Sequence, residues 1–270
     1  MKRKILFLAA FLVSTISEAS VTDTIHVYSK SMKKNVPVVI ILPDNHASAG
    51  TLPVVYLLHG YSGNHLDWIS KAPGFEKAAD QYDLMIVCPD GGFNSWYWDS
   101  PVDPESKYET FVSDELIKAI DEKYPTVKSR KGRAVTGLSM GGHGALYLAF
   151  RHQDIFGAAG SMSGGVDIRP FPNNWDMSKK LGLYAEQADR WEKYTVINLL
   201  NLLTPGSLEI IIDCGTEDFF YEVNKNLHQQ LLYRNIPHDY IVRPGAHNWT
   251  YWTNSVKYEL LFFRNYFDSN

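Results

Sequence analysis

The chain has 270 residues, of which 45% are hydrophobic and 21% are charged, and its formal net charge at pH 7 is −4. This length suits one α/β domain with a sizeable core, and the composition is that of a water-soluble globular protein. The slightly acidic balance excludes the basic surface by which proteins bind DNA or RNA, so we expect no nucleic-acid partner.

Residues 1–19 have the pattern of a secretory signal peptide. The charged segment Lys2-Arg3-Lys4 precedes a short apolar run at residues 5–16, and Ser17-Glu18-Ala19 then offers small residues at a cleavage site. The run is too short to span a bilayer comfortably, although an uncleaved membrane anchor is the alternative. We therefore expect a secreted or periplasmic protein without stable membrane insertion after cleavage.

Strand-like and helix-like segments alternate along the rest of the chain. Enrichment in Thr, Val and Ile around a turn signal predicts an antiparallel hairpin over residues 24–42. The later strands are expected at residues 53–58, 84–87, 134–138, 156–162, 208–213 and 238–242. The helices are expected at residues 108–124, 144–151, 223–233 and 252–267. This alternation predicts an α/β fold with a mostly parallel sheet and helices on both faces.

Residues 167–205 interrupt the alternation. They contain Pro170 and Pro172, followed by a helical piece that includes Trp191. We interpret the chain as a single domain over residues 20–270 that carries a lid-like insertion at about 167–205. In open α/β sheets ligands bind beyond the carboxyl ends of the strands, and we expect the insertion to lie there.

The segment Gly137-Leu138-Ser139-Met140-Gly141 has the G-x-S-x-G pattern of a nucleophile elbow. An apolar strand-like run precedes it and a helix-forming run follows it. The chemistry needs a serine on a tight strand-to-helix turn, where strained backbone demands very small neighbours. Ser139 is therefore the predicted nucleophile. The alternatives are a glycine-rich turn without chemistry and a phosphate-binding loop, although no Lys-Ser or Lys-Thr follows the glycines.

A serine nucleophile needs a base, and the base needs an orienting acid. His247 lies in a loop between a predicted strand and the last predicted helix, where this fold places the base. The acid is expected after the strand at residues 208–213, where Glu217 and Asp218 are adjacent and only one can point toward the histidine. We favour Asp218 and keep Glu217 as the alternative.

Two backbone N–H groups are needed to hold the oxyanion that forms during acyl transfer. One is expected from Met140, the residue after the nucleophile. The other is expected from the loop His59-Gly60-Tyr61, which follows the strand at residues 53–58, with Tyr61 as the donor. The Tyr61 side chain is then free to line the pocket.

Tryptophans gather in the loops near these residues. Trp98 ends an aromatic run after the strand at residues 84–87, Trp175 lies in the insertion, and Trp249 follows the predicted base. Aromatic walls suit a sugar ring or an aryl acyl group. We expect Trp98, Trp175 and Trp249 to bind substrate, with core packing as the alternative for each.

The sequence gives no sign of a metal or another cofactor. No spacing of His or Cys has the pattern of a zinc site, and acyl transfer by a serine needs no cofactor. Cys88 and Cys214 each end a strand-like apolar run. Two cysteines make no disulfide framework, so we expect both to be buried free thiols.

Together these motifs resemble the esterase family of α/β-hydrolases that contains S-formylglutathione hydrolases, feruloyl esterases, tributyrin esterases and mycolyltransferases. The resemblance extends from His59-Gly60-Tyr61 to His247, and residues 137–145, Gly-Leu-Ser-Met-Gly-Gly-His-Gly-Ala, are especially similar. It implies the α/β-hydrolase fold. It also implies a triad and two oxyanion donors, which are Ser139, Asp218, His247, Tyr61 and Met140.

Two segments are more similar to tributyrin and feruloyl esterases, at residues 214–219 and 245–249. S-formylglutathione hydrolases carry His-Ser-Tyr-Tyr-Phe where this chain has His-Asn-Trp-Thr-Tyr-Trp. The resemblance implies a serine carboxylesterase that acts through an acyl-enzyme on small-molecule or carbohydrate esters, with acetyl or feruloyl groups as candidates. The alternatives are an acyltransferase to a sugar, an S-formylglutathione-type thioesterase and a non-catalytic carbohydrate-binding protein. The sequence does not give the oligomeric state.

Overall fold

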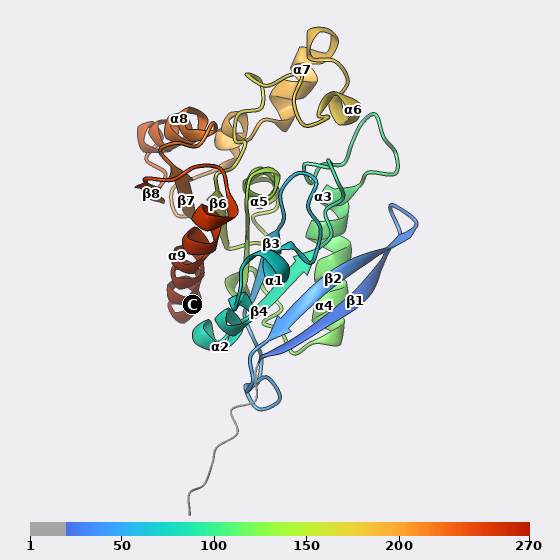
Figure 1. Ribbon diagram of the computed structural model, residues 1–270, viewed down its shortest axis with the longest axis vertical. Coiled ribbons are helices and arrows are strands. Elements are labelled where there is room, and N and C mark those ends of the chain that lie inside the picture. The colour runs from blue at the N-terminus through green and yellow to red at the C-terminus, as the bar shows by residue number, and fades with distance from the viewer. Residues whose placement is uncertain (1–19) are drawn as a thin grey trace, which may run out of the picture.

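The computed structural model describes residues 20–270, and the expected signal peptide at residues 1–19 lies outside this part of the chain (Figure 1). A single eight-stranded sheet has the order β1-β2-β4-β3-β5-β6-β7-β8. Its strands are β1 (Val21–Ser29), β2 (Lys34–Leu42), β3 (Val54–Leu58), β4 (Met85–Pro89), β5 (Arg133–Gly137), β6 (Ala158–Met162), β7 (Glu209–Gly215) and β8 (Asp239–Arg243).

The strand directions agree with the predicted fold. β1 pairs antiparallel with β2, and β2 pairs antiparallel with β4. The other neighbouring pairs are parallel. The α/β-hydrolase prediction, with a mostly parallel sheet and an N-terminal antiparallel hairpin, is therefore confirmed.

Nine α-helices lie in residues 20–270. They are α1 (Asp67–Lys71), α2 (Ala78–Tyr82), α3 (Tyr108–Thr110), α4 (Leu116–Lys123), α5 (Met140–Arg151), α6 (Ser178–Leu181), α7 (Tyr184–Tyr194), α8 (Tyr221–Tyr233) and α9 (Trp249–Asp268). A π-helical turn at Phe111–Glu115 joins α3 to α4, and 3₁₀ turns lie at Phe75–Lys77, Arg130–Gly132 and Val196–Leu202. The sequence did not predict α1 and α2, because five residues are too few to show a helical period.

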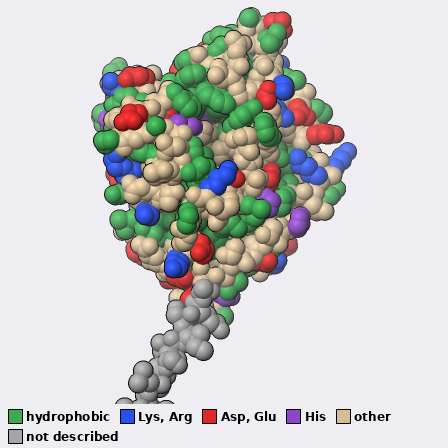
Figure 2. All heavy atoms as spheres, viewed as in Figure 1, with side chains coloured by type: hydrophobic (Ala, Val, Ile, Leu, Met, Phe, Trp, Pro, Cys, Tyr) green, Lys and Arg blue, Asp and Glu red, His purple; other side chains and the backbone are tan. Residues whose placement is uncertain are grey.

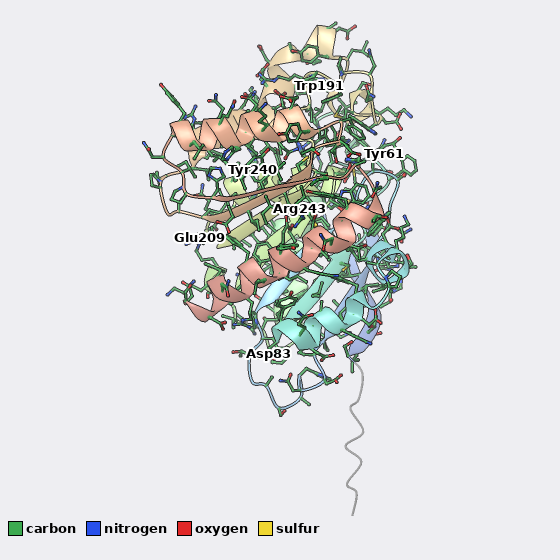
Figure 3. The ribbon with its side chains drawn as sticks, turned by 60° about the vertical axis from the view of Figure 1, so that its left-hand side comes forward. Tyr61, Asp83, Trp191, Glu209, Tyr240 and Arg243 are labelled. Atoms are coloured by element: carbon green, nitrogen blue, oxygen red, sulfur yellow. The ribbon has the colours of Figure 1, made fainter. Side chains whose placement is uncertain are left out.

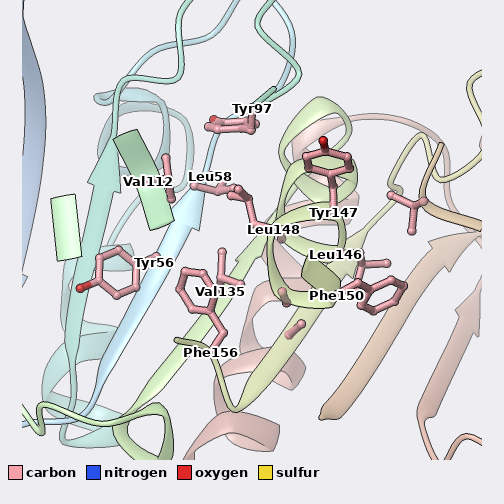
Figure 4. Close-up of a cluster of buried hydrophobic side chains, with 14 of the residues drawn as sticks. Tyr56, Leu58, Tyr97, Val112, Val135, Leu146, Tyr147, Leu148, Phe150 and Phe156 are labelled. Atoms are coloured by element: carbon pink, nitrogen blue, oxygen red, sulfur yellow. The ribbon is translucent and has the colours of Figure 1, made fainter. Parts of the chain in front are cut away.

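The sheet separates two apolar cores. In β3, Tyr56 and Leu58 face the core that contains α4, α5 and α8, whereas Val55 and Leu57 face the core that contains α2 and α9. Figure 4 shows the first core, where side chains of β3 and β5 meet those of α5. Because both faces of these strands are covered, their sequences are continuous apolar runs, as in parallel sheets generally.

The predicted insertion lies between β6 and β7. Residues 163–208 carry α6, α7 and the 3₁₀ turn at Val196–Leu202. Figure 1 shows α6 and α7 at the upper end of the molecule, beyond α5. Trp191 of α7 is fully buried and its indole N–H donates to the Gly182 carbonyl at 3.0 Å, so a core side chain anchors this segment.

The surface carries side chains of both charges, and both cysteines are free thiols. On the face shown in Figure 2, basic and acidic side chains are interspersed, and hydrophobic side chains gather mainly in the upper half. No helix within residues 20–270 is long and apolar enough to cross a membrane. Cys88 and Cys214 are buried free thiols, as predicted.

Candidate active site

Ser139 stands at the turn between β5 and α5 with strained backbone. Its φ of 56° and ψ of −116° lie outside the regions that side chains ordinarily allow. The turn also brings α5 against the end of β3, since a Cβ on Gly141 would lie 2.5 Å from the Leu58 carbonyl oxygen and 2.6 Å from that of His59. Glycine is therefore required at Gly141, and the Ser139 side chain is left partly exposed beyond the sheet.

The loops after β7 and β8 meet at two glycines. A Cβ on Gly215 would lie 2.2 Å from the Gly245 carbonyl oxygen, so the two backbones approach as closely as glycine allows. The Glu217 N–H donates to that same Gly245 oxygen at 2.9 Å. This contact sets Asp218, in the first loop, beside His247, in the second.

A chain of hydrogen bonds joins the three predicted triad residues. The Asp218 Oδ2 atom lies 2.8 Å from His247 Nδ1, and His247 Nε2 lies 2.9 Å from Ser139 Oγ. A carboxylate only accepts, so Nδ1 carries the ring proton and Nε2 is free to accept from the serine hydroxyl. Asp218 is buried and its other oxygen accepts from the Phe220 N–H at 2.8 Å, whereas Glu217 is exposed. The structure thus places Asp218, and not Glu217, against His247.

Packing fixes the His247 ring from several sides. The edge of Trp252 meets the ring at a centroid distance of 4.8 Å, and Phe219 lies at 4.1 Å. Directly after His247, the Asn248 side chain accepts from the Tyr251 N–H at 3.1 Å and caps α9. The histidine is therefore held between a capped helix and aromatic rings.

The two predicted oxyanion donors lie on either side of the serine. Met140 is the first residue of α5, and Tyr61 follows Gly60, where an added Cβ would lie 3.5 Å from Ser139 Cβ. Neither the Met140 N–H nor the Tyr61 N–H donates to another group within residues 20–270. Both donors remain open to an anion at the N-terminus of α5, where the helix dipole also favours negative charge.

Buried polar contacts brace the loop that carries Tyr61. The Tyr97 hydroxyl donates to the His59 carbonyl at 3.0 Å, and the Gly91 N–H donates to His59 Nε2 at 2.7 Å. The remaining ring nitrogen, Nδ1, therefore donates to the Gly60 carbonyl, also at 2.7 Å. Burial lowers the pKa of His59, which keeps this ring neutral in its structural role.

Trp98 is enclosed in the core, which is the alternative to its predicted role in substrate binding. Its side chain is 0% exposed, its indole N–H donates to His143 Nε2 at 2.9 Å, and its ring stacks on Trp96. The run turns inward because Gly144 of α5 leaves room for Tyr97, whose ring would lie 2.4 Å from a Cβ there. The aromatic run at residues 96–98 is therefore part of the core and packs against α5, the helix that follows Ser139.

Trp175 does lie near the triad. Its half-buried ring stacks on Phe219 at 5.7 Å, and the Phe219 ring in turn contacts His247. Phe219 itself is 52% exposed. Phe219 is not among the residues predicted from the sequence, although its position next to Asp218 is a signal that could identify it.

Trp249 packs toward the helices rather than toward the serine. Its ring meets the edges of Trp68 and Trp252 at 5.1 and 5.6 Å, and the Lys71 ammonium lies over it at 5.4 Å. On the opposite side of the site, Phe93 is 58% exposed and packs edge-on against Tyr61 at 5.0 Å. Phe93 and Phe219 are thus the exposed aromatic side chains that border the triad and the oxyanion loop.

His143 is the second buried histidine near the elbow. Because its Nε2 accepts from Trp98, its Nδ1 carries the proton and donates to the Gly165 carbonyl at 2.8 Å. Burial lowers the pKa of His143 to about 4, so the ring is neutral at neutral pH. Within residues 20–270, no three His, Cys, Asp or Glu side chains are grouped so that they could hold a metal ion.

Comparison with known proteins relates this chain to esterases. Residues 29–263 match the protein family described as "Putative esterase". The acetyl esterase of Caldicellulosiruptor saccharolyticus is 28% identical over an alignment of 261 residues, and the match covers 86% of this chain and 94% of that protein. The S-formylglutathione hydrolase of Bos taurus is 28% identical over 213 residues, covering 71% of this chain and 73% of that protein. A solved ferulic acid esterase has a TM-score of 0.80 and 28% identity, and the match covers 92% of this chain and 99% of that one.

The neutral His143 should make folding sensitive to acid. Its pKa is 6.5 ordinarily and about 4 when buried, so between these pH values the unfolded chain holds a proton here that the folded chain lacks. The free energy of unfolding should therefore decrease as the pH falls from 6.5, by about 3 kcal/mol at most from this group. His143→Gln keeps a donor and an acceptor without titrating, so urea unfolding of this variant should depend less on pH. An equal pH dependence in both proteins would contradict the assignment.

Proposed function

Because this chain belongs to the "Putative esterase" family and is a carboxylic ester hydrolase, we propose that it is a serine esterase with Ser139 as nucleophile, His247 as general base and Asp218 as orienting acid. The hydrogen-bond chain from Asp218 through His247 to Ser139 carries this proposal. Each residue has the partner that its role requires, and the order Ser, acid, His along the chain is that of α/β-hydrolases.

The proposed reaction has two halves. In the first, His247 Nε2 takes the proton of Ser139 as Oγ attacks the ester carbonyl carbon, and the resulting oxyanion accepts from the Met140 and Tyr61 N–H groups. His247 then gives the proton to the departing alcohol oxygen, which leaves an acyl-enzyme. In the second half, a water loses a proton to His247 and attacks the acyl carbonyl. Collapse of this intermediate releases the acid and returns the proton to Ser139 Oγ.

The burial of the acid supports the proposed role of the histidine. The Asp218 side chain is fully enclosed, while that of His247 is 14% exposed. A buried carboxylate beside Nδ1 holds the ring in the required tautomer and stabilises the imidazolium that forms when Nε2 takes the serine proton. The strained Ser139 backbone fits the same purpose, because strain of this kind concentrates at functional sites.

We propose acetyl or feruloyl esters of carbohydrates as the substrates. Two relatives with 28% identity, named acetyl esterase and ferulic acid esterase, support this substrate class. The exposed rings of Phe93 and Phe219 beside the site are further support, since aromatic side chains pack against sugar rings and aryl acyl groups.

Substitutions in the triad test the mechanism, with a substitution at the neighbouring Glu217 as the control. Ser139→Ala should lower kcat for p-nitrophenyl acetate by several orders of magnitude, and Asp218→Asn by about 10³- to 10⁴-fold. Glu217→Gln, one residue away and exposed, should stay within about threefold of wild type. Near-normal turnover by Ser139→Ala, or a larger loss in Glu217→Gln than in Asp218→Asn, would refute the assignment.

A comparison of two esters tests the substrate class. Phe219→Ala removes an exposed ring beside His247, so kcat/KM for methyl ferulate should fall about tenfold more than kcat/KM for p-nitrophenyl acetate. Damage to His247 would affect both esters alike, and the ratio within one variant is therefore the internal control. An unchanged ratio would argue against an aryl acyl group at Phe219.

A further inference from the structure

We propose that Asp176, in the insertion, is a positioning residue that holds the Tyr61 oxyanion donor in place. The inference rests on the proposed function, because it assigns a task to a residue outside the triad and outside the oxyanion loop. It would make the insertion part of the catalytic apparatus rather than only a cover over it.

The contact joins two segments that are far apart in sequence. The Tyr61 hydroxyl donates to Asp176 Oδ2 at 3.1 Å, and the Lys179 ammonium lies 2.8 Å from the other carboxylate oxygen, Oδ1. The Lys179 hydrogen bond lowers the pKa of Asp176, so the carboxylate stays ionised as an acceptor. Burial and the bond to Asp176 raise the pKa of Tyr61, which keeps the hydroxyl protonated as a donor. Lys179 thus fixes the carboxylate on one side while Tyr61 binds it on the other.

Strained backbone presents the carboxylate to Tyr61. Trp175 and Asp176 have φ values of 50° and 55°, so two consecutive residues other than glycine adopt the left-handed region. Aromatic packing holds this conformation, since the Trp175 ring lies 5.1 to 6.0 Å from the rings of Phe171, Phe219, Phe220 and Trp96. Strain that surrounding packing maintains in this way is a feature of functional segments.

Hydrogen bonds hold the backbone on both sides of Tyr61, at Gly60 and at Ser62, but the Tyr61 N–H makes none of them. Gly60 precedes it, and Ser62 follows it with a φ of 59° and donates its N–H to the Phe93 carbonyl at 2.8 Å. The Tyr61 N–H itself has no partner within residues 20–270. The Tyr61 side chain adds a second anchor to this loop, through its packing on Phe93 and its bond to Asp176. An oxyanion donor must be aimed accurately, and this anchor would aim it.

Trp175 and Asp176 also connect the two sides of the site. Trp175 stacks on Phe219, beside the acid and the base, while Asp176 binds Tyr61, beside the oxyanion. Figure 3 shows Tyr61 in the part of the molecule that lies below the segment carrying Trp191, which is the insertion. Movement of the insertion would therefore alter the acid loop and the oxyanion loop together.

A double-mutant cycle with p-nitrophenyl acetate tests the proposal. Tyr61→Phe removes only the hydroxyl, and Asp176→Ala removes its acceptor together with the partner of Lys179. Each should lower kcat about tenfold with little change in KM. The double variant should also be about tenfold slower, not a hundredfold, because both changes break the same contact. Asp189→Ala, which removes an exposed carboxylate from α7 of the same insertion, is the matched control and should keep the wild-type rate.

The outcomes separate this inference from the proposed function. The role of Asp176 would be overturned if Tyr61→Phe and Asp176→Ala kept the wild-type kcat, or if their losses added in the double variant. The serine mechanism would still stand in that case, provided that Ser139→Ala is inactive. An active Ser139→Ala would instead refute the mechanism itself. Tyr61→Phe deletes one oxygen from a half-buried side chain, so it decides the question even where Asp176→Ala lowers the melting temperature.

Discussion

The close approach of α5 to the end of β3 is the constraint on which the site depends. Gly141 lies so near the Leu58 and His59 carbonyl oxygens that no side chain fits there, and this approach puts Ser139 in its strained turn. The same approach brings the oxyanion loop after β3 beside the N-terminus of α5. One backbone contact thus sets the nucleophile, the helix dipole and both oxyanion donors in a common place.

A buried ion pair ties together the elements that carry the acid and the base. Asp213 of β7 is fully buried, accepts from the Tyr251 hydroxyl at 2.5 Å and from the Arg243 guanidinium, and so links β7, β8 and α9. Burial raises the pKa of Asp213 against the effect of these partners. Such a pair adds little net stability, but loss of one partner costs about 3–5 kcal/mol, so its effect is to fix relative positions. Those elements hold Asp218 and His247 in register with Ser139.

The sequence predicted what depends on local pattern. Continuous apolar runs gave the parallel strands, and the elbow motif with a later acid and histidine gave three residues that the structure joins by hydrogen bonds. The burial of Trp98 could not be predicted, because its loop turns inward only where Gly144 of α5 leaves room for the neighbouring Tyr97. The contact between Tyr61 and Asp176 was equally hidden, since it spans 115 positions and depends on a strained turn in the insertion.

In the proposed mechanism Ser139 is the one serine activated for acyl transfer. Reaction with a fluorophosphonate probe, followed by mass spectrometry of the intact and digested protein, identifies such a serine. We expect a single adduct on the peptide that contains Ser139, formed much more slowly when Asp218 is replaced by Asn. An unlabelled protein, or an adduct on a different serine, would contradict this mechanism.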